Sequence, residues 1–387
     1  LHLVIASPRP PSFWFCRCSV PTIRHVFPLS DSRTTSLEVR SFSCAQNETI
    51  CSQTTIMKGA VFVIALGLCL VAAVAFDPSP ITTFRLNGTV AAVVTVFDSK
   101  LNVDYSVINA QAAQLMQQGI RSVFVCGTTG ESLSLTVPER KLIAEAWRSA
   151  ATQYGLTLIV HVGTATPLES VDLAIHAQQI GADAIATMAT FFFKPSTASD
   201  VAAFLAQISA AAPKIPLYYY YIPSMTGVSI SVADILLAAT SSHHVPTLRG
   251  AKFSDADLYE FGRCVGLRDT YGSPFNLLFG RDEMLLGALA IGADGAVGST
   301  YNLPFMAPIY NRLLSAYASG NMTAAQAEQA RSRELVYLMK SYGGGALKAM
   351  LDLSGVLGGL PRPPFVALTP TQLSSLKQDL VKNGFLS

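Results

Sequence analysis

A lysine stands between apolar neighbours in the segment Gly250-Ala251-Lys252-Phe253. A buried ammonium group is costly without a partner, and burial lowers the pKa of the amine. A neutral amine is a nucleophile that can attack a ketone and form an imine. The alternative is a lysine at the rim of a strand, whose flexible stem carries the charge to solvent. This segment alone leaves both interpretations open.

Hydroxyl groups are concentrated in two further segments. In Cys126-Gly127-Thr128-Thr129-Gly130-Glu131 the glycines permit tight turns, and two hydroxyls with nearby N–H groups can bind an anion such as a carboxylate. The alternative is an ordinary loop with polar caps. Positions 218–221 are four tyrosines, and strand geometry places Tyr218 and Tyr220 on one face. A phenol facing a barrel interior can relay protons, although aromatic packing is the commoner role of such a run.

Acidic and hydroxyl side chains follow two later apolar runs. Asp282 and Glu283 come shortly after Phe279, and Ser299 follows Gly298. Carboxylates and hydroxyls suit a ligand that carries many hydroxyl groups. The alternative is helix N-capping by Asp282 and Ser299.

The elements that would position these groups alternate regularly. Strands are predicted at residues 89–97, 122–126, 157–162, 184–188, 217–221, 249–253, 276–279 and 295–298, with Ala- and Leu-rich helical segments between them. Strand and helix repeated eight times predict an α/β fold, a (β/α)8 TIM barrel. From about residue 304 the chain reads as additional C-terminal helices, one of them broken at Gly343-Gly344-Gly345. In such barrels the C-terminal ends of the strands build the active site, which is where the chemistry-bearing residues fall.

Composition excludes several classes of protein. Of the 387 residues 50% are hydrophobic and 13% are charged, which is too apolar for a disordered chain. The net charge is +2 and no basic run is interleaved with aromatic residues, so nucleic acid is not an expected partner. No cluster of His, Cys, Asp and Glu suggests a metal site.

The first part of the chain does not fit the barrel pattern. Residues 1–56 show no periodicity and read as a leader outside the mature protein. Met57 and Lys58 precede an apolar run that ends in a small-residue cleavage pattern before Phe76, so residues 57–75 are predicted to be a signal peptide. The run is too short for a membrane span. These features predict a secreted or lumenal protein whose barrel domain, with its C-terminal helices, covers residues 76–387.

Taken together, these motifs resemble the N-acetylneuraminate lyase branch of the pyruvate-dependent class I aldolases, which also includes dihydrodipicolinate synthase. The resemblance rests on the Gly-Thr-Thr-Gly-Glu turn at 127–131, Tyr220 with Ile222-Pro223, Gly250-Ala251-Lys252, Gly280 with Asp282-Glu283, and the segment 295–302. Each motif is short, but their order at successive strand ends is specific. The resemblance runs from about Gly88 into the C-terminal helices.

The resemblance implies a role for each residue. Lys252 would form the Schiff base with the C2 ketone of a sialic acid, so no other cofactor and no metal are expected. Tyr220 would transfer the proton of the C4 hydroxyl, and Thr128 and Thr129 would bind the substrate carboxylate and assist Tyr220. The positions that would bind the hydroxyl chain of the sugar are Gly280, Asp282, Glu283 and Ser299. The products would be N-acetylmannosamine and pyruvate, in a reversible reaction.

The family also predicts a homotetramer and, since its members are normally cytoplasmic, a cytoplasmic protein if the signal peptide is not used. The chain departs from the family pattern at Thr190 and Tyr221, where Pro and Asn or His are usual. Three alternatives remain: a 2-keto-3-deoxy sugar acid aldolase, a dihydrodipicolinate synthase, and a secreted sialic-acid-binding protein without turnover. The synthase typically has an arginine where this chain has Met225, and an apolar side chain cannot pair with a second carboxylate.

Overall fold

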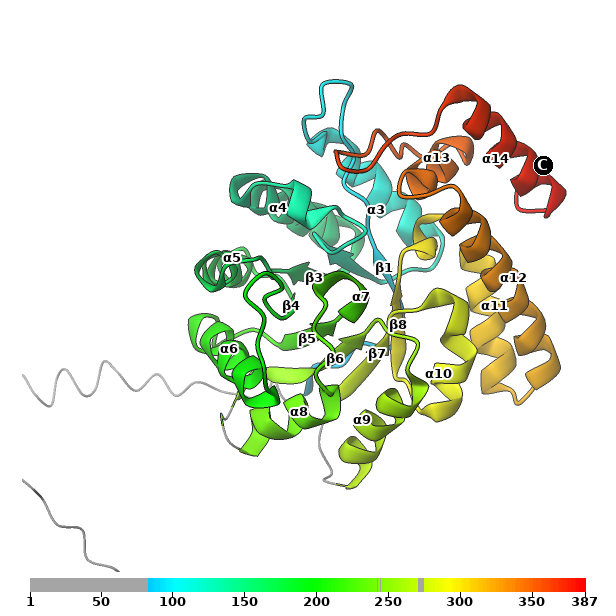
Figure 1. Cartoon of the computed structure of the whole chain (residues 1–387). Coiled ribbons are helices and arrows are strands. Elements are labelled where there is room, and N and C mark those ends of the chain that lie inside the picture. The colour runs from blue at the N-terminus through cyan, green and yellow to red at the C-terminus, as the bar shows by residue number, and fades with distance from the viewer. Residues whose placement is uncertain (1–82, 242, 244, 271–274) are drawn as a thin grey trace, which may run out of the picture. The chain divides into compact units, whose positions relative to one another are not determined.

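Eight parallel strands form a closed barrel in the computed structural model, which describes residues 83–241, 243, 245–270 and 275–387 (Figure 1). The strands pair in sequence order, and β1 closes the barrel against β8. They are β1 (Gly88–Ala92), β2 (Ser122–Val125), β3 (Thr157–His161), β4 (Ala184–Thr187), β5 (Leu217–Tyr221), β6 (Leu248–Phe253), β7 (Asn276–Phe279) and β8 (Gly295–Gly298).

Helices connect successive strands and surround the barrel (Figure 1). They are α3 (Ile108–Gln117), α4 (Val137–Tyr154), α5 (Pro167–Gln179), α6 (Ala198–Ala211), α7 (Pro223–Thr226), α8 (Val232–Ser241), α9 (Leu258–Thr270) and α10 (Leu285–Ile291). Short 3₁₀ turns are η1 (Tyr105–Val107), η2 (Ser132–Ser134), η3 (Asp282–Met284) and η4 (Thr300–Asn302). Several helix starts are encoded locally: at α4, Thr136 and Glu139 form a reciprocal capping box that satisfies otherwise unpaired N–H groups.

Side chains alternate between two hydrophobic layers, because successive residues of a strand point to opposite faces. On β5, Tyr218 and Tyr220 belong to the cluster inside the barrel, together with Phe124 of β2. Tyr219 and Tyr221 belong to the larger cluster between the barrel and its helices. The predicted division of the tyrosine run into two faces is confirmed, and one tyrosine pair is delivered to the barrel interior.

The C-terminal extension consists of α11 (Ala307–Ala318), α12 (Met322–Ser341), α13 (Ala346–Leu353) and α14 (Pro370–Lys382). The predicted break at Gly343-Gly344-Gly345 is confirmed, since it separates α12 from α13. Gly344 allows a close approach, because a Cβ atom there would lie 2.3 Å from the ring of Phe365. This crossing places α12, α13 and the segment that follows beside the end of the barrel that carries the predicted site residues.

The predicted fold class is confirmed, and the strands at 217–221, 276–279 and 295–298 have the predicted bounds. The strand predicted at 89–97 ends earlier, at Ala92, because the chain leaves the sheet to form the loop over the barrel end. The leader and the signal peptide lie outside the described residues, so their status and the start of the mature domain stay predictions. Within the described part of the chain, no helix is long and apolar enough to cross a membrane.

Barrel closure beside Lys252 depends on the missing side chain of Gly250. A Cβ atom there would lie 1.8 Å from the carbonyl oxygen of Asn276 on β7, and backbone of a neighbouring strand cannot move aside cheaply. Gly250→Ala is therefore expected to lower the free energy of unfolding by about 2 kcal/mol or more, which denaturant titration would show as a lower unfolding midpoint. The matched control is Gly266→Ala in α9, where nothing lies within 4 Å of the added atom and helix propensity predicts a gain of about 1 kcal/mol. Equal midpoints for the two variants would contradict this account.

Candidate active site

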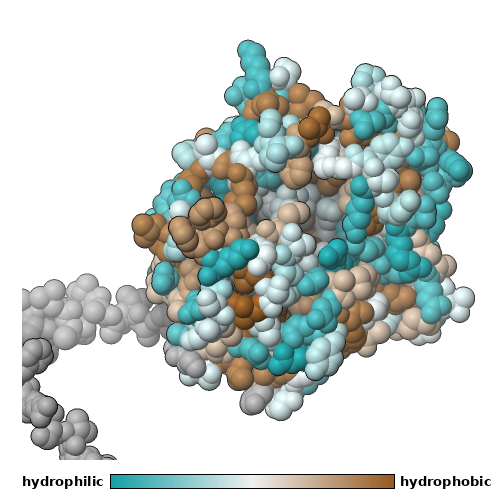
Figure 2. Space-filling model, in the orientation of Figure 1, coloured by the Kyte–Doolittle hydropathy of each residue, from teal (hydrophilic) through white to brown (hydrophobic). Residues whose placement is uncertain are grey.

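A cavity of about 190 Å³ lies at the C-terminal ends of the strands. Every site residue predicted from the sequence lines it: Thr128, Thr129, Tyr220, Lys252, Gly280, Asp282, Glu283 and Ser299. They come from the ends of β2, β5, β6, β7 and β8, so only closure of the barrel brings them together. In the space-filling view, this side of the molecule is recessed over the barrel (Figure 2).

Lys252 is the most deeply desolvated cation in this cavity, with a residue exposure of 4%. Its Nζ lies 4.0 Å from the ring centroid of Phe124 and 4.1 Å from that of Tyr220. Burial lowers the pKa of Lys252 from an ordinary 10.5 to about 7, although the charge of Asp282 opposes this shift. A substantial fraction of the amine is therefore neutral at physiological pH, and this is the form that attacks a carbonyl carbon.

Tyr220 lies beside this amine and makes a hydrogen bond to Thr128, with 3.1 Å between the two hydroxyl oxygens. Burial raises the pKa of Tyr220 to about 12, while hydrogen bonds from Thr128 and Ser254 act in the opposite direction. The phenol is thus protonated at rest and is held in a short chain of hydroxyl groups. Such a chain can take up a proton at one end and release one at the other.

Thr128 and Thr129 sit on a turn whose backbone is unusual at both ends. Cys126 and Glu131 adopt left-handed φ values of 56° and 52°, which are unfavourable for residues with a side chain. Gly130 lies close to the backbone of Val93, whose carbonyl oxygen would be 3.2 Å from a Cβ atom. Both threonines of this tight turn line the cavity, and their role in binding an anion stays a prediction.

Asp282 is a buried carboxylate that does not cap its own helix, contrary to the alternative considered for it. One of its oxygens accepts hydrogen bonds from the N–H and the hydroxyl of Thr300, at 3.0 and 2.7 Å. Its Oδ1 atom is buried and has no partner among the described residues. Burial raises the pKa of Asp282 to about 6, against the hydrogen bonds from Thr300. A free acceptor in this position can receive a hydrogen bond from a hydroxyl of a ligand.

Glu283 is held by two cations at the mouth of the same cavity. Its Oε1 atom lies 2.8 Å from Nζ of Lys340 on α12 and 3.6 Å from the guanidinium of Arg281. Ser299 precedes η4 and makes no capping hydrogen bond with its side chain, so its hydroxyl is free of that role. Gly280 packs against Ser254, whose Oγ would lie 1.9 Å from a Cβ atom at position 280.

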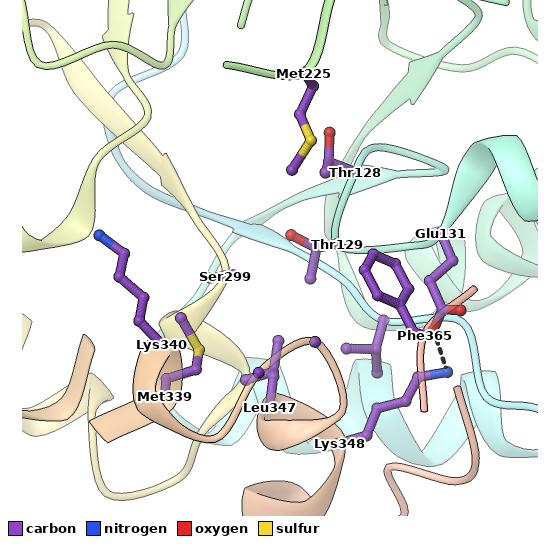
Figure 3. Close-up of a pocket in the computed structure, with 13 residues that line it drawn as sticks. Thr128, Thr129, Glu131, Met225, Ser299, Met339, Lys340, Leu347, Lys348 and Phe365 are labelled. Carbon is purple, nitrogen blue, oxygen red and sulfur yellow. Dashed lines mark ion pairs between the residues drawn. The ribbon is translucent and has the colours of Figure 1, made fainter. Parts of the chain in front are cut away.

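A larger cavity of about 470 Å³ adjoins the first and shares with it Thr128, Thr129, Ser299, Met339 and Lys340 (Figure 3). Its remaining wall is largely apolar and includes Val94, Met225, Leu347 and Phe365. In Figure 3, Met225 lies next to Thr128, and Lys340 and Leu347 project from the helices of the C-terminal extension. The two cavities together give the strand ends room for a ligand larger than a three-carbon acid.

Sequence reasoning missed several groups that surround the nucleophile. Ser254 lies two residues after Lys252, so strand alternation could have placed it on the same side. His161 at the end of β3 stacks edge-on against Tyr220, with 5.5 Å between ring centroids. Its Nδ1 donates a hydrogen bond to the carbonyl oxygen of Cys126 at 2.9 Å. Burial lowers the pKa of His161 well below its usual range, so the ring is neutral.

In the part of the chain that the structure describes, no three or more His, Cys, Asp or Glu side chains are grouped so that they could hold a metal ion. The polar groups of the cavity are hydroxyls, carboxylates and amines, which suit proton transfer and covalent catalysis.

Comparison with known proteins agrees with this geometry. The family model of the dihydrodipicolinate synthetase family matches residues 85–383. N-acetylneuraminate lyases of Mus musculus and Homo sapiens are each 39% identical over 307 residues, which cover 78% of this chain and 94% of theirs. The native structure of N-acetylneuraminate lyase (sialic acid aldolase) from Aliivibrio salmonicida superposes with a TM-score of 0.74 at 37% identity, and covers 79% of this chain and 99% of that one.

The low pKa of Lys252 predicts a specific pH dependence. The rate at which a small amine-reactive reagent acetylates Lys252, measured by mass spectrometry, should rise with pH through a midpoint near pH 7, because only the neutral amine reacts. Asp282→Asn should move the midpoint to lower pH, since it removes the negative charge that favours the ammonium form. The control is Asp269→Asn, whose exposed carboxylate is paired with Arg268 and should leave the midpoint unchanged. A rate that still climbs towards pH 10 would show that the amine is not desolvated.

Proposed function

This chain belongs to the dihydrodipicolinate synthetase family, and we propose that it is a Schiff-base-forming lyase that cleaves N-acetylneuraminate to N-acetylmannosamine and pyruvate. The observation that carries the proposal is the buried amine of Lys252, about 4.1 Å from the ring of Tyr220, in a cavity that also holds Thr128 and Thr129. The named relatives supply the substrate class, because residues 85–383 match the family model and similarity extends over nearly the full length of the vertebrate lyases.

The covalent step begins with the neutral Lys252. Its nitrogen attacks the C2 ketone of the open-chain sugar acid, and loss of water gives a protonated imine. The imine accepts the electron pair of the C3–C4 bond as that bond breaks, which leaves an enamine on the lysine and an aldehyde at C4. Protonation of C3 and hydrolysis of the imine then release pyruvate and regenerate the amine.

Tyr220 transfers protons during these reaction steps. The C4 hydroxyl must lose its proton as the aldehyde forms, and C3 must gain one before pyruvate leaves. The phenol can accept the first proton while its own moves to Thr128, whose hydroxyl proton passes in turn to the substrate carboxylate bound there. The same relay runs in reverse when the phenol delivers a proton to C3. Thr128 and Thr129 fix the carboxylate of the substrate at the turn, which places C2 beside Lys252.

The far end of the cavity suits the hydroxyl chain of a sugar. Asp282 offers an unpartnered acceptor, Glu283 is oriented by Lys340, and Ser299 adds a hydroxyl group. Met225 stands where the synthase pattern has an arginine, and it lines the largely apolar cavity of about 470 Å³ beside the turn. An apolar wall disfavours a second carboxylate on the partner substrate, so the arrangement favours the lyase over the synthase.

Release of pyruvate from N-acetylneuraminate by the purified protein tests the proposed reaction. A coupled assay with lactate dehydrogenase measures pyruvate, and 2-keto-3-deoxy sugar acids run in parallel distinguish the lyase from other aldolases of the family. Binding of N-acetylneuraminate without pyruvate release would identify a binding protein and would refute the enzymatic proposal.

Substitutions at Lys252 and Tyr220 should impair different steps of the reaction. With pyruvate and borohydride, the wild-type protein should acquire a reduced adduct on Lys252, and Lys252→Ala should lose both adduct and turnover because no other group supplies the electron sink. Tyr220→Phe keeps the amine, so trapping should persist while cleavage falls by roughly 10²-fold or more. Peptide mapping of the adduct to another lysine, or sialic acid cleavage by Lys252→Ala, would refute the mechanism.

A homotetramer is the assembly that we propose, supported by exposed aromatic side chains beside the barrel. Phe192 and Phe193 after β4 are 76% and 83% exposed and pack edge-on against each other. A patch of this kind is costly unless a partner covers it. Light scattering at micromolar concentration should give the mass of four chains, and Phe192→Asp with Phe193→Asp should give smaller species. Tyr259→Asp, at an equally exposed aromatic residue on α9, is the control, and a monomeric wild-type protein would exclude the tetramer.

A further inference from the structure

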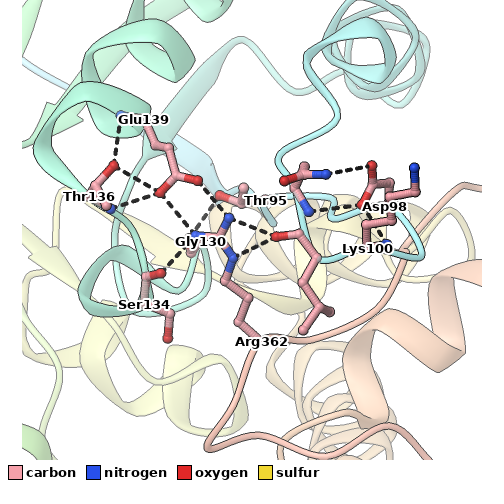
Figure 4. A network of polar contacts seen from close by, with 10 residues as sticks. Thr95, Asp98, Lys100, Gly130, Ser134, Thr136, Glu139 and Arg362 are labelled. Carbon is pink, nitrogen blue, oxygen red and sulfur yellow. Dashed lines mark hydrogen bonds and ion pairs between the residues drawn. The ribbon is translucent and has the colours of Figure 1, made fainter.

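The segment that follows α13 is fastened to the turn that carries Thr128 and Thr129. Arg362, at the centre of this segment, donates hydrogen bonds to four residues that follow β1 or β2: Leu101, Glu131, Ser134 and Glu139. Figure 4 shows its guanidinium group beside Ser134 and Glu139. Its backbone N–H reaches a carboxylate oxygen of Glu131 at 2.8 Å. Glu131 ends the turn, so a residue more than two hundred positions away in the chain holds the turn directly.

The guanidinium group of Arg362 makes hydrogen bonds along its edges and packs one face against an aromatic ring. It forms a two-bond pair with the carboxylate of Glu139 at 2.6 and 3.0 Å, which is a strong and directional arrangement. It also donates to the carbonyl oxygens of Leu101 and Ser134, and its carbon atom lies 4.3 Å from the ring centroid of Phe97. The hydrogen bond with Arg362 is the largest of the causes that lower the pKa of Glu139 to about 2. The segment is therefore anchored to the loops on both sides of β2.

Lys348 on α13 holds the same carboxylate from the other side. Its Nζ lies 2.6 Å from Oε1 of Glu131, and the two side chains are only 5% and 6% exposed (Figure 3). The same Nζ donates to the carbonyl oxygen of Leu360, which ties α13 to the segment that contains Arg362. Both oxygens of Glu131 are thus bound to the C-terminal extension, one by Lys348 and one by Arg362.

Glu131 is well placed to transmit this restraint to the threonines. Its own N–H donates to the carbonyl oxygen of Thr128 at 3.0 Å, so the two residues close one turn. Its left-handed φ of 52° is an unfavourable conformation that surrounding contacts must maintain. Thr95 adds a hydrogen bond to the carbonyl oxygen of Gly130 at 2.8 Å. Movement of the Glu131 carboxylate would therefore shift the backbone that carries Thr128 and Thr129.

We infer that Lys348 and Arg362 are positioning residues for the carboxylate-binding turn: they hold Glu131 so that Thr128 and Thr129 are set to bind the carboxylate of the substrate. The inference rests on the proposed function, because it assumes that a 2-oxo acid binds at this turn. It assigns the C-terminal extension a role in substrate affinity. The amine of Lys252 on β6 lies against the rings of Phe124 and Tyr220, so its reactivity should be largely independent of Lys348 and Arg362.

The choice of variants follows from the burial of the ion pair. Removal of Lys348 alone would leave an unpaired buried carboxylate, which destabilises a fold for reasons unrelated to substrate binding. The double variant Glu131→Gln with Lys348→Met removes both charges and keeps the shape, and the amide oxygen can still accept from the N–H of Arg362. Arg362→Met removes the guanidinium contacts and leaves the backbone hydrogen bond. Arg362→Lys keeps the positive charge but lacks the paired N–H donors of the guanidinium group.

The experiment measures borohydride trapping of pyruvate on the full-length chain as a function of pyruvate concentration. The half-saturating concentration should rise roughly tenfold or more in Arg362→Met and in the double variant, because small misplacements of binding groups are costly. The trapping rate at saturating pyruvate should change little. The half-saturating pyruvate concentration of Arg362→Lys should lie between those of the wild type and Arg362→Met. The matched control is Arg312→Met, which breaks a two-bond pair with Glu328 of similar length, at 2.6 and 3.0 Å, within the same C-terminal extension.

The outcomes separate this inference from the proposal on which it rests. A wild-type protein that forms no adduct with pyruvate would overturn both. A second outcome is normal trapping by the wild type, with an unchanged half-saturating pyruvate concentration but a lowered melting temperature in Arg362→Met and in the double variant. This outcome would leave the proposed function intact and overturn the positioning role. If Arg362→Met does not fold, the double variant alone decides, because it leaves no unpaired buried charge.

Discussion

The desolvation of a single amine is the constraint around which the site is organised. Lys252 can act as a nucleophile near neutral pH because the rings of Phe124 and Tyr220 replace water around its Nζ, which lowers its pKa to about 7. Among the described residues, the charge of Asp282 opposes this shift. Asp282 is itself buried and bound to Thr300, and burial raises its pKa to about 6. Burial thus favours the neutral form of both groups, because it lowers the pKa of the amine and raises that of the carboxyl.

A closed parallel barrel is well suited to maintain such a site. The interior layer of β5 delivers Tyr220 to the amine, while Tyr219 and Tyr221 pack against the helices and stabilise the same strand from outside. Gly250 permits the close contact between β6 and β7 that closes the wall beside Lys252. Residues that line the candidate site thus alternate with residues of the outer core on the same strand, so the site can be polar without interrupting that core.

The C-terminal extension completes the site from outside the barrel. Lys340 on α12 holds Glu283 at the mouth of the cavity, and Lys348 with Arg362 holds Glu131 at the end of the turn that carries Thr128 and Thr129. Both restraints act on charged groups that would otherwise be free to rotate or would be buried without a partner. Elements α12, α13 and the segment that follows thus each contribute a contact to a residue of the two adjoining cavities.

The sequence by itself determined the barrel and the identity of its chemical groups, because strand and helix periodicity is local and Lys252, Tyr220 and the Gly-Thr-Thr-Gly-Glu turn are contiguous motifs. It could not determine how those groups are held. The ion pair of Glu131 with Lys348 and the contacts of Arg362 join residues more than two hundred positions apart, and nothing in the local pattern signals them. The pKa of Lys252 was likewise decided by tertiary structure, since desolvation depends on which side chains exclude water once the strands have closed into a barrel.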